Sequence, residues 1–286
     1  MTGTPLMEIA TIHRPETQAA HIRSVERVIA TMRENLCEPL PLEDMADVAC
    51  LSPYHFNRVF RQITGIPPAQ FLYALRIEQA KRLLVNTEIS VTDTCFETGY
   101  NSLGSFTSRF TKLVGVSPNE FRRLIKQLDG FRLGMVRALV ETQCAGRKPN
   151  PGARLKGTIY CPQAPEGLIF AGFFHRPIPE SRPIACAILD RPGVYELEPN
   201  CIGKGYVFSA TLPWSAGIRD LLTLDCAFRG RSGELLVGPR GTQGETNVRL
   251  RPNHVIHPPI LAAMPLLVAS RLAIPLPVCC DGHGGI

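Results

Sequence analysis

The chain has 286 residues, of which 44% are hydrophobic and 20% charged, and its formal net charge is +6. This length suffices for two domains of ordinary size, and this composition excludes a disordered or fibrous protein. Residues 1–132 hold 15 Lys and Arg against 14 Asp and Glu, and residues 133–286 hold 16 against 11. The first half is nearly neutral, so binding of a polyanion would require its positive charges to gather on one face.

The chain carries no recognisable export or membrane signal. Its first twenty residues mix polar and charged side chains, among them Glu8 and Arg14, and contain no apolar core of a signal peptide. The most apolar stretch, Pro258–Val278, holds five prolines and Arg271, which excludes a membrane span. The ten cysteines form no Cys-x-x-Cys pair. We expect a cytoplasmic protein, associated with the nucleoid, whose cysteines are reduced.

The first half has the apolar spacing of amphipathic helices. Residues 17–35 carry one apolar stripe, and prolines end that segment. Glu43 and Asp44 favour a short helix over 42–49, because the helix dipole favours acids in the first turn. Capping Ser, Pro and Gly residues predict further helices over residues 53–64, 68–86, 91–98, 102–114 and 118–128.

A pattern of six residues occurs twice, fifty positions apart. The first copy is Phe56, Phe60, Gly65, Ile66, Pro68 and Phe71, and the second is Phe106, Phe110, Gly115, Val116, Pro118 and Phe121. Each copy predicts a short helix, a turn, a second helix and the start of a third. This is the pattern of a duplicated helix-turn-helix unit, which binds DNA. The helix between the copies would span ~27 Å, which can place two reading helices one turn of DNA apart, ~34 Å.

Beyond about residue 132 the chain changes to short apolar runs separated by Pro and Gly. These runs fall at residues 157–160, 168–174, 184–189, 193–197, 205–212, 221–228, 234–237 and 247–251. Short strands at this spacing favour a β-sandwich. A last helix is predicted from Pro259 to about Leu272, with apolar residues on one side.

The sequence therefore predicts an α+β multidomain protein. An all-α double helix-turn-helix domain occupies residues 17–130, and residues 131–152 form a linker. A mainly-β, sandwich-like domain with a C-terminal helix occupies residues 153–272, and residues 273–286 form a tail.

The second helix of the first unit has side chains suited to reading DNA. On a helical wheel, Tyr54, Asn57, Arg58 and Arg61 lie opposite the apolar side. Arg suits the O6 and N7 acceptors of guanine, and Asn suits N6 and N7 of adenine. His55 and Arg61 are expected at the DNA backbone. An ordinary solvated polar face is the alternative for one such helix, and the repeat favours DNA binding.

The second unit has fewer side chains that could read bases. Its predicted DNA-contacting residues are Ser102, Gly104, Ser105, Ser108, Arg109 and Lys112. Most of these side chains are short, and Arg109 lies on the flank of the helix. We expect this unit to contribute phosphate contacts, methyl contacts and shape reading.

Three segments, residues 52–65, 76–84 and 99–123, resemble the AraC/XylS family of bacterial transcription regulators. The resemblance covers roughly residues 20–126. It implies a seven-helix domain whose third and sixth helices enter successive major-groove segments of promoter DNA. The base-reading positions that it implies are Tyr54, Asn57 and Arg58 in the first unit and Gly104, Ser105 and Ser108 in the second. Family members usually carry Arg two residues after the aromatic of the second reading helix, where this chain has Ser108.

The resemblance also implies a role for the second half of the chain. The family usually places its effector domain before the DNA-binding half, so here the order is reversed and the effector domain falls at about residues 150–272. This half is expected either to bind a small molecule or to form a homodimer through the helix around residues 260–272. The candidate ligand-binding residues are Phe174, His175, Tyr206 and Trp214.

The leading prediction is a sequence-specific transcription regulator, most simply an activator that binds double-stranded promoter DNA and RNA polymerase and needs no cofactor. The alternative is an enzyme that uses this DNA-binding domain, as the methyl-accepting DNA repair proteins do. Those carry a reactive cysteine before a histidine and a four-cysteine zinc site, whereas Cys161 here precedes Pro-Gln. No catalytic residue set and no metal site is predicted. A weaker alternative is metal or redox chemistry at Cys279, Cys280 and His283.

Overall fold

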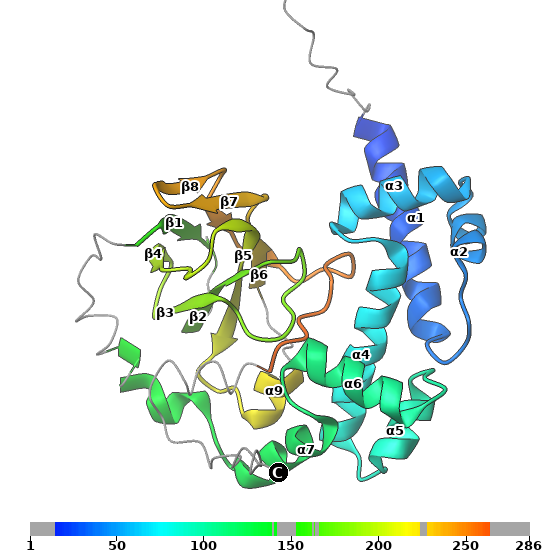
Figure 1. Ribbon diagram of the computed structural model, residues 1–286, viewed down its shortest axis with the longest axis horizontal. Coiled ribbons are helices and arrows are strands. Elements are labelled where there is room, and N and C mark those ends of the chain that lie inside the picture. The colour runs from blue at the N-terminus through cyan, green and yellow to red at the C-terminus, as the bar shows by residue number, and fades with distance from the viewer. Residues whose placement is uncertain are drawn as a thin grey trace, which may run out of the picture.

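The computed structural model describes residues 15–138, 140–141, 153–161, 163, 166–223 and 228–263. Figure 1 shows two halves side by side, a helical half formed by the first part of the chain and a β-rich half formed by the second. No helix in the described ranges combines the length and the apolar character needed to cross a bilayer.

Seven helices of the first half lie where the sequence predicts them, to within two residues. They are α1 (Pro15–Glu34), α2 (Leu42–Ala49), α3 (Pro53–Thr64), α4 (Pro68–Asn86), α5 (Val91–Glu97), α6 (Leu103–Val114) and α7 (Pro118–Gln127). The predicted caps at Ser52 and Ser90 form: the Ser52 side chain accepts from the His55 amide, and the Ser90 side chain accepts from the Asp93 amide. Ser102, predicted to begin its helix, caps α6 instead and accepts from the Ser105 amide.

The two copies of the sequence repeat have nearly the same core. In the first, Phe60 packs edge-to-face against Phe56 and Phe71, with ring centroids 5.5 and 5.4 Å apart. In the second, Phe110 packs against Phe106 and Phe121, with centroids 5.7 and 5.6 Å apart. All six rings are fully buried. The repeated aromatic residues therefore build the same packing motif twice.

The ends of the two reading helices also match. Gly65 ends α3 with φ +86°, and Gly115 ends α6 with φ +94°. Both are left-handed conformations that favour glycine. Each glycine amide donates to the carbonyl four residues earlier, at Arg61 and Thr111. The two copies of the sequence repeat therefore have the same local structure at the ends of α3 and α6.

The second half forms two sheets from ten strands in the described ranges. They are β1 (Leu155–Tyr160), β2 (Gly167–Phe174), β3 (Ala185–Leu189), β4 (Gly193–Leu197), β5 (Gly203–Pro213), β6 (Phe228–Arg231), β7 (Leu235–Gly238), β8 (Gly241–Gln243), β9 (Val248–Arg249) and β10 (Arg251–Pro252). One sheet has the order β4-β1-β9 and the other β10-β6-β5-β2-β3, with β7 pairing β5 and β8 pairing β7. One buried cluster contains residues of both sheets, including Ile159, Tyr195, Phe173 and Val207.

The structure corrects two predicted elements of this half. A strand is predicted over residues 221–228. The structure instead has a helix at its start, α9 (Ile218–Thr223), and β6 begins only at Phe228. Ile218, Leu221 and Leu222 are buried at a helical spacing, and the Asp220 side chain accepts from the Gly217 amide at 2.8 Å. The apolar run was therefore a helical stripe rather than a strand.

The predicted C-terminal helix is wrong for the part that the structure describes. Residues 259–263 are not helical, and residues 264–272 lie outside the described residues, as do 273–286 with the Cys279–His283 cluster. The Leu261 amide donates to the Pro179 carbonyl at 2.9 Å, and the Ala263 amide donates to the Val114 carbonyl at 3.1 Å. These amides bond to distant segments, which replaces the hydrogen bonds of a helix.

The first part of the predicted linker over 131–152 packs against the β-rich half. Residues 133–136 form a 3-10 turn, η1 (Leu133–Val136), and the Arg132 backbone bridges Gly217. Leu133 and Val140 are fully buried in the second half, in a cluster with Leu221. The chain therefore enters the β-rich half directly after α7, while residues 142–152 lie outside the described residues.

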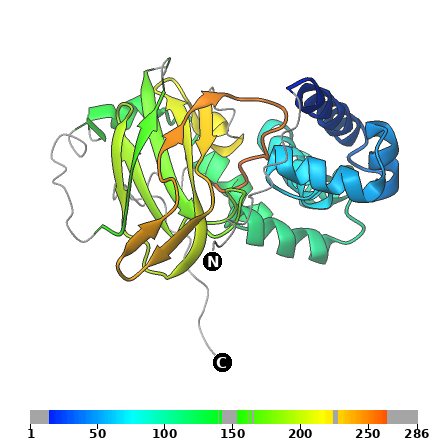
Figure 2. The same cartoon turned by 90° about the horizontal axis from the view of Figure 1, so that it is seen from above.

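One of the apolar clusters contains residues of both halves. Ile178 from the loop after β2, Leu222 from α9, and Leu261 and Ala263 are buried in the same cluster as the helices. Lys81 of α4, only 1% exposed, donates from Nζ to the carbonyls of Ile260 and Leu261 at 3.1 and 3.3 Å. Figure 2 shows this C-terminal segment, in orange, running from the β-rich half to the helices. The segment fixes one half against the other.

Candidate nucleic-acid interface and an interdomain cavity

The polar face of α3 is open to solvent. Tyr54 is 84% exposed, and Asn57, Arg58 and Arg61 are also exposed, whereas His55 is half-buried with its ring 5.6 Å from that of His21. Within the part of the chain that the structure describes, the side chains of Arg58 and Arg61 form no hydrogen bond or ion pair. The helix therefore presents an amide and two guanidinium groups, which are the donors that recognise base edges and phosphates.

The corresponding face of α6 is exposed but carries shorter side chains. Ser102, Gly104, Ser105, Ser108, Arg109 and Lys112 are all exposed. The guanidinium of Arg109 lies over the Tyr73 ring of α4, with 4.2 Å between Cζ and the ring centroid. A cation–π contact of this kind holds the side chain beside α4. The family's usual arginine position is occupied here by Ser108, and Arg109 follows it by one residue. The Arg109 side chain is directed toward α4.

Three of the four residues predicted to bind a ligand belong to one hydrophobic cluster, namely Phe174, Tyr206 and Trp214. Phe174 lies opposite Tyr206 in the register of β2 and β5. Phe174 is buried, with its ring 5.7 Å from that of Phe208. Its neighbour His175 is exposed, and the Tyr206 hydroxyl donates to the Glu234 carboxylate at 3.0 Å. Trp214 lies under the Arg137 guanidinium. None of the four lines the cavity described next.

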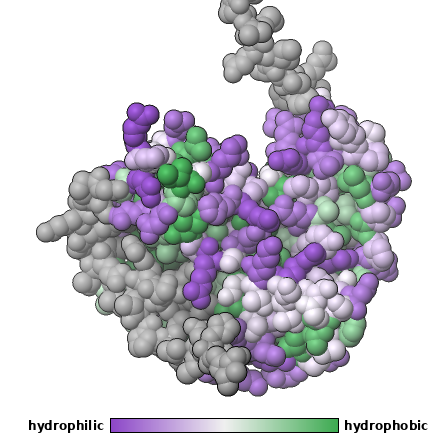
Figure 3. Space-filling model, viewed as in Figure 1, coloured by the Kyte–Doolittle hydropathy of each residue, from purple (hydrophilic) through white to green (hydrophobic). Residues whose placement is uncertain are grey.

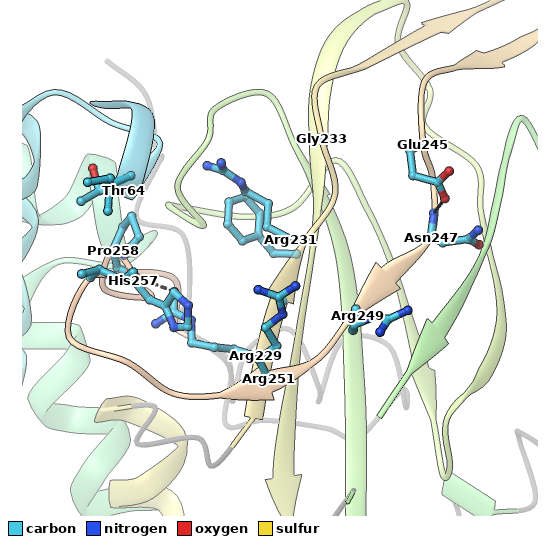
Figure 4. A pocket seen from close by; sticks show the side chains of 14 residues that line it. Thr64, Arg229, Arg231, Gly233, Glu245, Asn247, Arg249, Arg251, His257 and Pro258 are labelled. Atoms are coloured by element: carbon cyan, nitrogen blue, oxygen red, sulfur yellow. Dashed lines mark hydrogen bonds between the residues drawn. The ribbon is translucent and has the colours of Figure 1, made fainter. Parts of the chain in front are cut away.

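A cavity of about 420 Å³ opens between the end of α3 and the β-rich half. Figure 3 shows hydrophilic side chains on both sides of the hollow between the two halves. The charged side chains of the lining are four arginines and one glutamate. The lining is formed by Ile63, Thr64, Phe208, Arg229, Gly230, Arg231, Gly233, Glu245, Asn247, Arg249, Arg251, Ile256, His257 and Pro258. Figure 4 shows Thr64, His257 and Pro258 on one side of the cavity and Glu245, Asn247 and Arg249 on the other.

The lining of this cavity lowers the pKa of a histidine. Burial, followed by the charges of Arg229, His254, Arg251 and Arg231, lowers the pKa of His257 from 6.5 to about 4. The His257 imidazole is therefore neutral at neutral pH, and its Nδ1 lies 3.1 Å from the His254 amide, from which it accepts.

These arginines were not among the residues predicted to bind a ligand, although their spacing carries a signal. Arg229 and Arg231 are two residues apart, and so are Arg249 and Arg251. Side chains two apart in a strand lie on the same face, so each pair predicts a basic face. The predicted strand over 221–228 ended before Arg229 and Arg231, whereas the predicted strand over 247–251 contained Arg249 and Arg251.

Comparison with known proteins places the helical half in a family. A helix-turn-helix domain model matches residues 45–124. The HTH-type transcriptional activator AarP of Providencia stuartii is 31% identical over 98 residues, which cover 34% of this chain and 73% of that protein. The chain belongs to the AraC-type helix-turn-helix family. The expected family relationship of the helical half is thus confirmed.

Other relatives match about a third of this chain. The MmsAB operon regulatory protein of Pseudomonas aeruginosa is 37% identical over 101 residues, 35% of this chain and 33% of that protein. The bifunctional transcriptional activator/DNA repair enzyme AdaA of Bacillus subtilis is 31% identical over 107 residues, 37% of this chain and 51% of that protein. The chain thus spans about half of one of these relatives and a third of the other.

A solved structure also matches part of the chain. The DNA-binding domain of the global transcriptional factor AdpA, in complex with a target DNA, is 33% identical and covers 35% of this chain and 90% of that one, with a TM-score of 0.34.

Within the described residues, no three His, Cys, Asp or Glu side chains lie together as metal ligands would.

Proposed function

We propose that the protein is a sequence-specific transcription regulator, an activator that binds double-stranded promoter DNA through α3 and α6. The observation that carries this proposal is the open polar face of α3, with Tyr54, Asn57 and Arg58 exposed beside a fully buried aromatic core. The family membership of residues 45–124 supports it. A helix with this face can enter the major groove and contact base edges with its side chains.

The two helices have different tasks in this proposal. Asn57 and Arg58 of α3 contact bases, and His55 and Arg61 contact the backbone. Ser102, Ser105, Ser108 and Lys112 of α6 contact phosphates and respond to DNA shape, because their side chains offer no bidentate donor for a base. The Arg109 guanidinium, stacked on Tyr73, supports the shape of the second unit rather than base reading.

The β-rich half is the effector domain in this proposal, and it follows the DNA-binding domain along the chain. Its two sheets enclose a common apolar cluster, which supports a sandwich-like arrangement. Residues 260–263 pack within the chain against α4 and α6, which favours an effector role over a dimer contact at that segment. Gel filtration at two protein concentrations, with and without candidate metabolites, tests self-association separately.

RNA polymerase is the proposed partner in activation, and the site of action is promoter DNA in the cytoplasm, at the nucleoid. In-vitro transcription from a promoter that holds a selected binding site tests the direction of regulation. The proposal expects more transcript with added protein, and a fall in transcript would identify a repressor.

The second candidate function is DNA repair, because the Bacillus subtilis relative is named a bifunctional transcriptional activator and DNA repair enzyme. Repair by methyl transfer would require a reactive cysteine in this chain. Burial raises the pKa of the Cys161 thiol and of the Cys95 thiol, which lowers the fraction of nucleophilic thiolate. This disfavours methyl transfer to Cys161 and Cys95, and we infer that the protein acts as a regulator on the strength of the open polar face of α3. A mass increase of 14 Da on a cysteine after incubation with methylated DNA, which is about the mass of one CH₂, would support repair instead.

Selection of bound duplexes from random DNA, followed by fluorescence anisotropy of the full chain, tests the main proposal. The selected duplex should bind at least ~10³-fold more tightly than a scrambled one at physiological salt. The slope of log affinity against log salt should report several phosphate contacts. Equal affinity for selected and scrambled duplexes would contradict sequence-specific binding.

A further inference from the structure

Four arginines lie on neighbouring strands beside the interdomain cavity. Arg229 and Arg231 belong to β6, and Arg249 and Arg251 belong to β9 and β10. Arg251 lies directly opposite Arg229 in the antiparallel register of β10 and β6. Like charges directly opposite each other destabilise a pair of strands. This arrangement therefore has an electrostatic cost that a bound negative charge would offset.

One of these arginines is buried. Arg229 is 9% exposed, and its Nη2 donates to the Pro258 carbonyl at 2.5 Å. Glu245 is the one acidic residue among those that line the cavity, against four arginines. The low pKa of His257 reflects the same cluster of arginines. Burial of the imidazole and the neighbouring positive charges disfavour a further positive charge there.

We propose that this cavity binds a small multivalent anion, a metabolite that carries phosphate or carboxylate groups. Guanidinium groups match both groups because they donate paired hydrogen bonds to two oxygens. The volume of about 420 Å³ is that of a site for a small molecule. Phe208, Ile63 and Ile256 also line it and offer apolar contacts for the carbon skeleton of the ligand.

The cavity faces away from the polar side of α3, which favours a small anion over a DNA phosphate. Ile63 lines the cavity. At ~100° per residue, Arg58 lies ~140° and Tyr54 ~180° around the helix from Ile63. DNA held by the exposed side chains of α3 would therefore lie on the other side of this helix from the cavity.

Arg231 links the cavity to the end of the reading helix. Its Nη1 donates to the Pro177 carbonyl at 3.0 Å, and its guanidinium lies against Gly65, the residue that ends α3. It also lies over the Tyr206 ring, 5.4 Å from the centroid. An anion that engages Arg231 changes this contact and hence the support of α3. This coupling to DNA affinity rests on the proposed function, whereas anion binding does not.

Isothermal titration of the full chain with pyrophosphate and with citrate, at an ionic strength held constant with KCl, tests the site. At least one probe should bind saturably at one site. Arg251→Gln and Arg249→Gln should each weaken that binding at least tenfold. Arg240→Gln, a matched exposed arginine between β7 and β8, should leave it unchanged. Circular dichroism melts of all three variants check that the fold is retained.

Three outcomes would overturn the anion site. They are no saturable heat with either probe, an equal loss of binding in Arg240→Gln, and unchanged binding in both cavity variants. DNA titrations of the same variants separate the sources of negative charge. If both cavity variants weaken DNA binding and reduce the salt slope while neither probe binds, the arginines contact DNA phosphates instead. Anion binding without any DNA binding would keep the site and reject the proposed function.

Discussion

The two helix-turn-helix units have the same interior and different exteriors. Phe60 and Phe110 each pack between the two other repeated aromatics of their units, edge-to-face in every pair except the tilted pair of Phe106 and Phe110. Gly65 and Gly115 end their reading helices in the same conformation. On the outside, Arg58 of the first unit extends into solvent, whereas Ser108 occupies the matching position of the second. The difference teaches that the packing constraints of this fold are separate from the recognition surface, which can diverge while the core is kept.

The largest expected effect tests whether the two cores are equivalent. Phe60→Ala and Phe110→Ala should each lower the free energy of unfolding by about 3–5 kcal/mol, because each removes a fully buried ring and leaves a cavity. Urea titration followed by circular dichroism measures both. Exposed Tyr54→Ala is the control and should change stability by less than about 0.5 kcal/mol. A loss in one unit with none in the other would show that the cores are not equivalent.

The next effect concerns the exteriors. Arg58→Ala should weaken binding to the selected DNA by about 1–3 kcal/mol and relax one base position, because a bidentate donor to a base is lost. Ser108→Ala should cost less than about 0.5 kcal/mol. Anisotropy titrations on matched duplexes measure both. The division of tasks is wrong if Arg109→Ala abolishes sequence preference and Arg58→Ala does not.

The interior of the helical half could be predicted from its sequence, whereas its relation to the β-rich half could not. Helix ends were readable because Ser52 and Gly65 set local backbone conformations that neighbours hardly alter. The segment at 259–263 was misassigned because its amides bond to Pro179 and Val114, which are distant in the chain. Periodicity carries no information on such long-range partners.

The candidate DNA-contacting residues were readable for a similar reason. A helical wheel places Asn57 and Arg58 on one face once the helix is known. The cavity required knowledge of pairing, because Arg229 and Arg251 become neighbours only in the register of β6 and β10. The stacking of Arg109 on Tyr73 likewise joins two helices whose contact the sequence does not reveal.

A smaller effect compares the two helix ends. Gly65→Ala and Gly115→Ala should each cost about 1–2 kcal/mol, because both glycines adopt left-handed backbone. Gly65→Ala should cost more, since a Cβ there would overlap the Arg231 guanidinium, whereas at Gly115 the nearest atom is 3.8 Å away. Thermal melts measure both. The extra cost should vanish in an Arg231→Ala background, and its persistence there would argue against this contact.

The smallest effect concerns the turns that precede the reading helices. Cys50 adopts φ +56° at the end of α2, where a left-handed conformation strains a residue with a Cβ. Cys50→Gly should therefore stabilise the chain by up to about 1 kcal/mol. Gly99 has φ +76° at the corresponding turn, where a Cβ would lie 2.6 Å from the Leu36 carbonyl oxygen, so Gly99→Ala should destabilise. Chemical unfolding checks the opposite signs, and two losses would refute the strain at Cys50.

The most direct test of the central claim is the base preference of each half of the binding site. Selection of bound duplexes from random DNA by the full chain, read by sequencing, gives that preference position by position. If the two helix-turn-helix units share a core but differ in surface, one half-site should be strongly defined and the other weakly defined. The two half-sites should lie about one helical turn, or ~34 Å, apart. Two half-sites defined equally well would contradict the claim, because α6 would then read bases as well as α3 does.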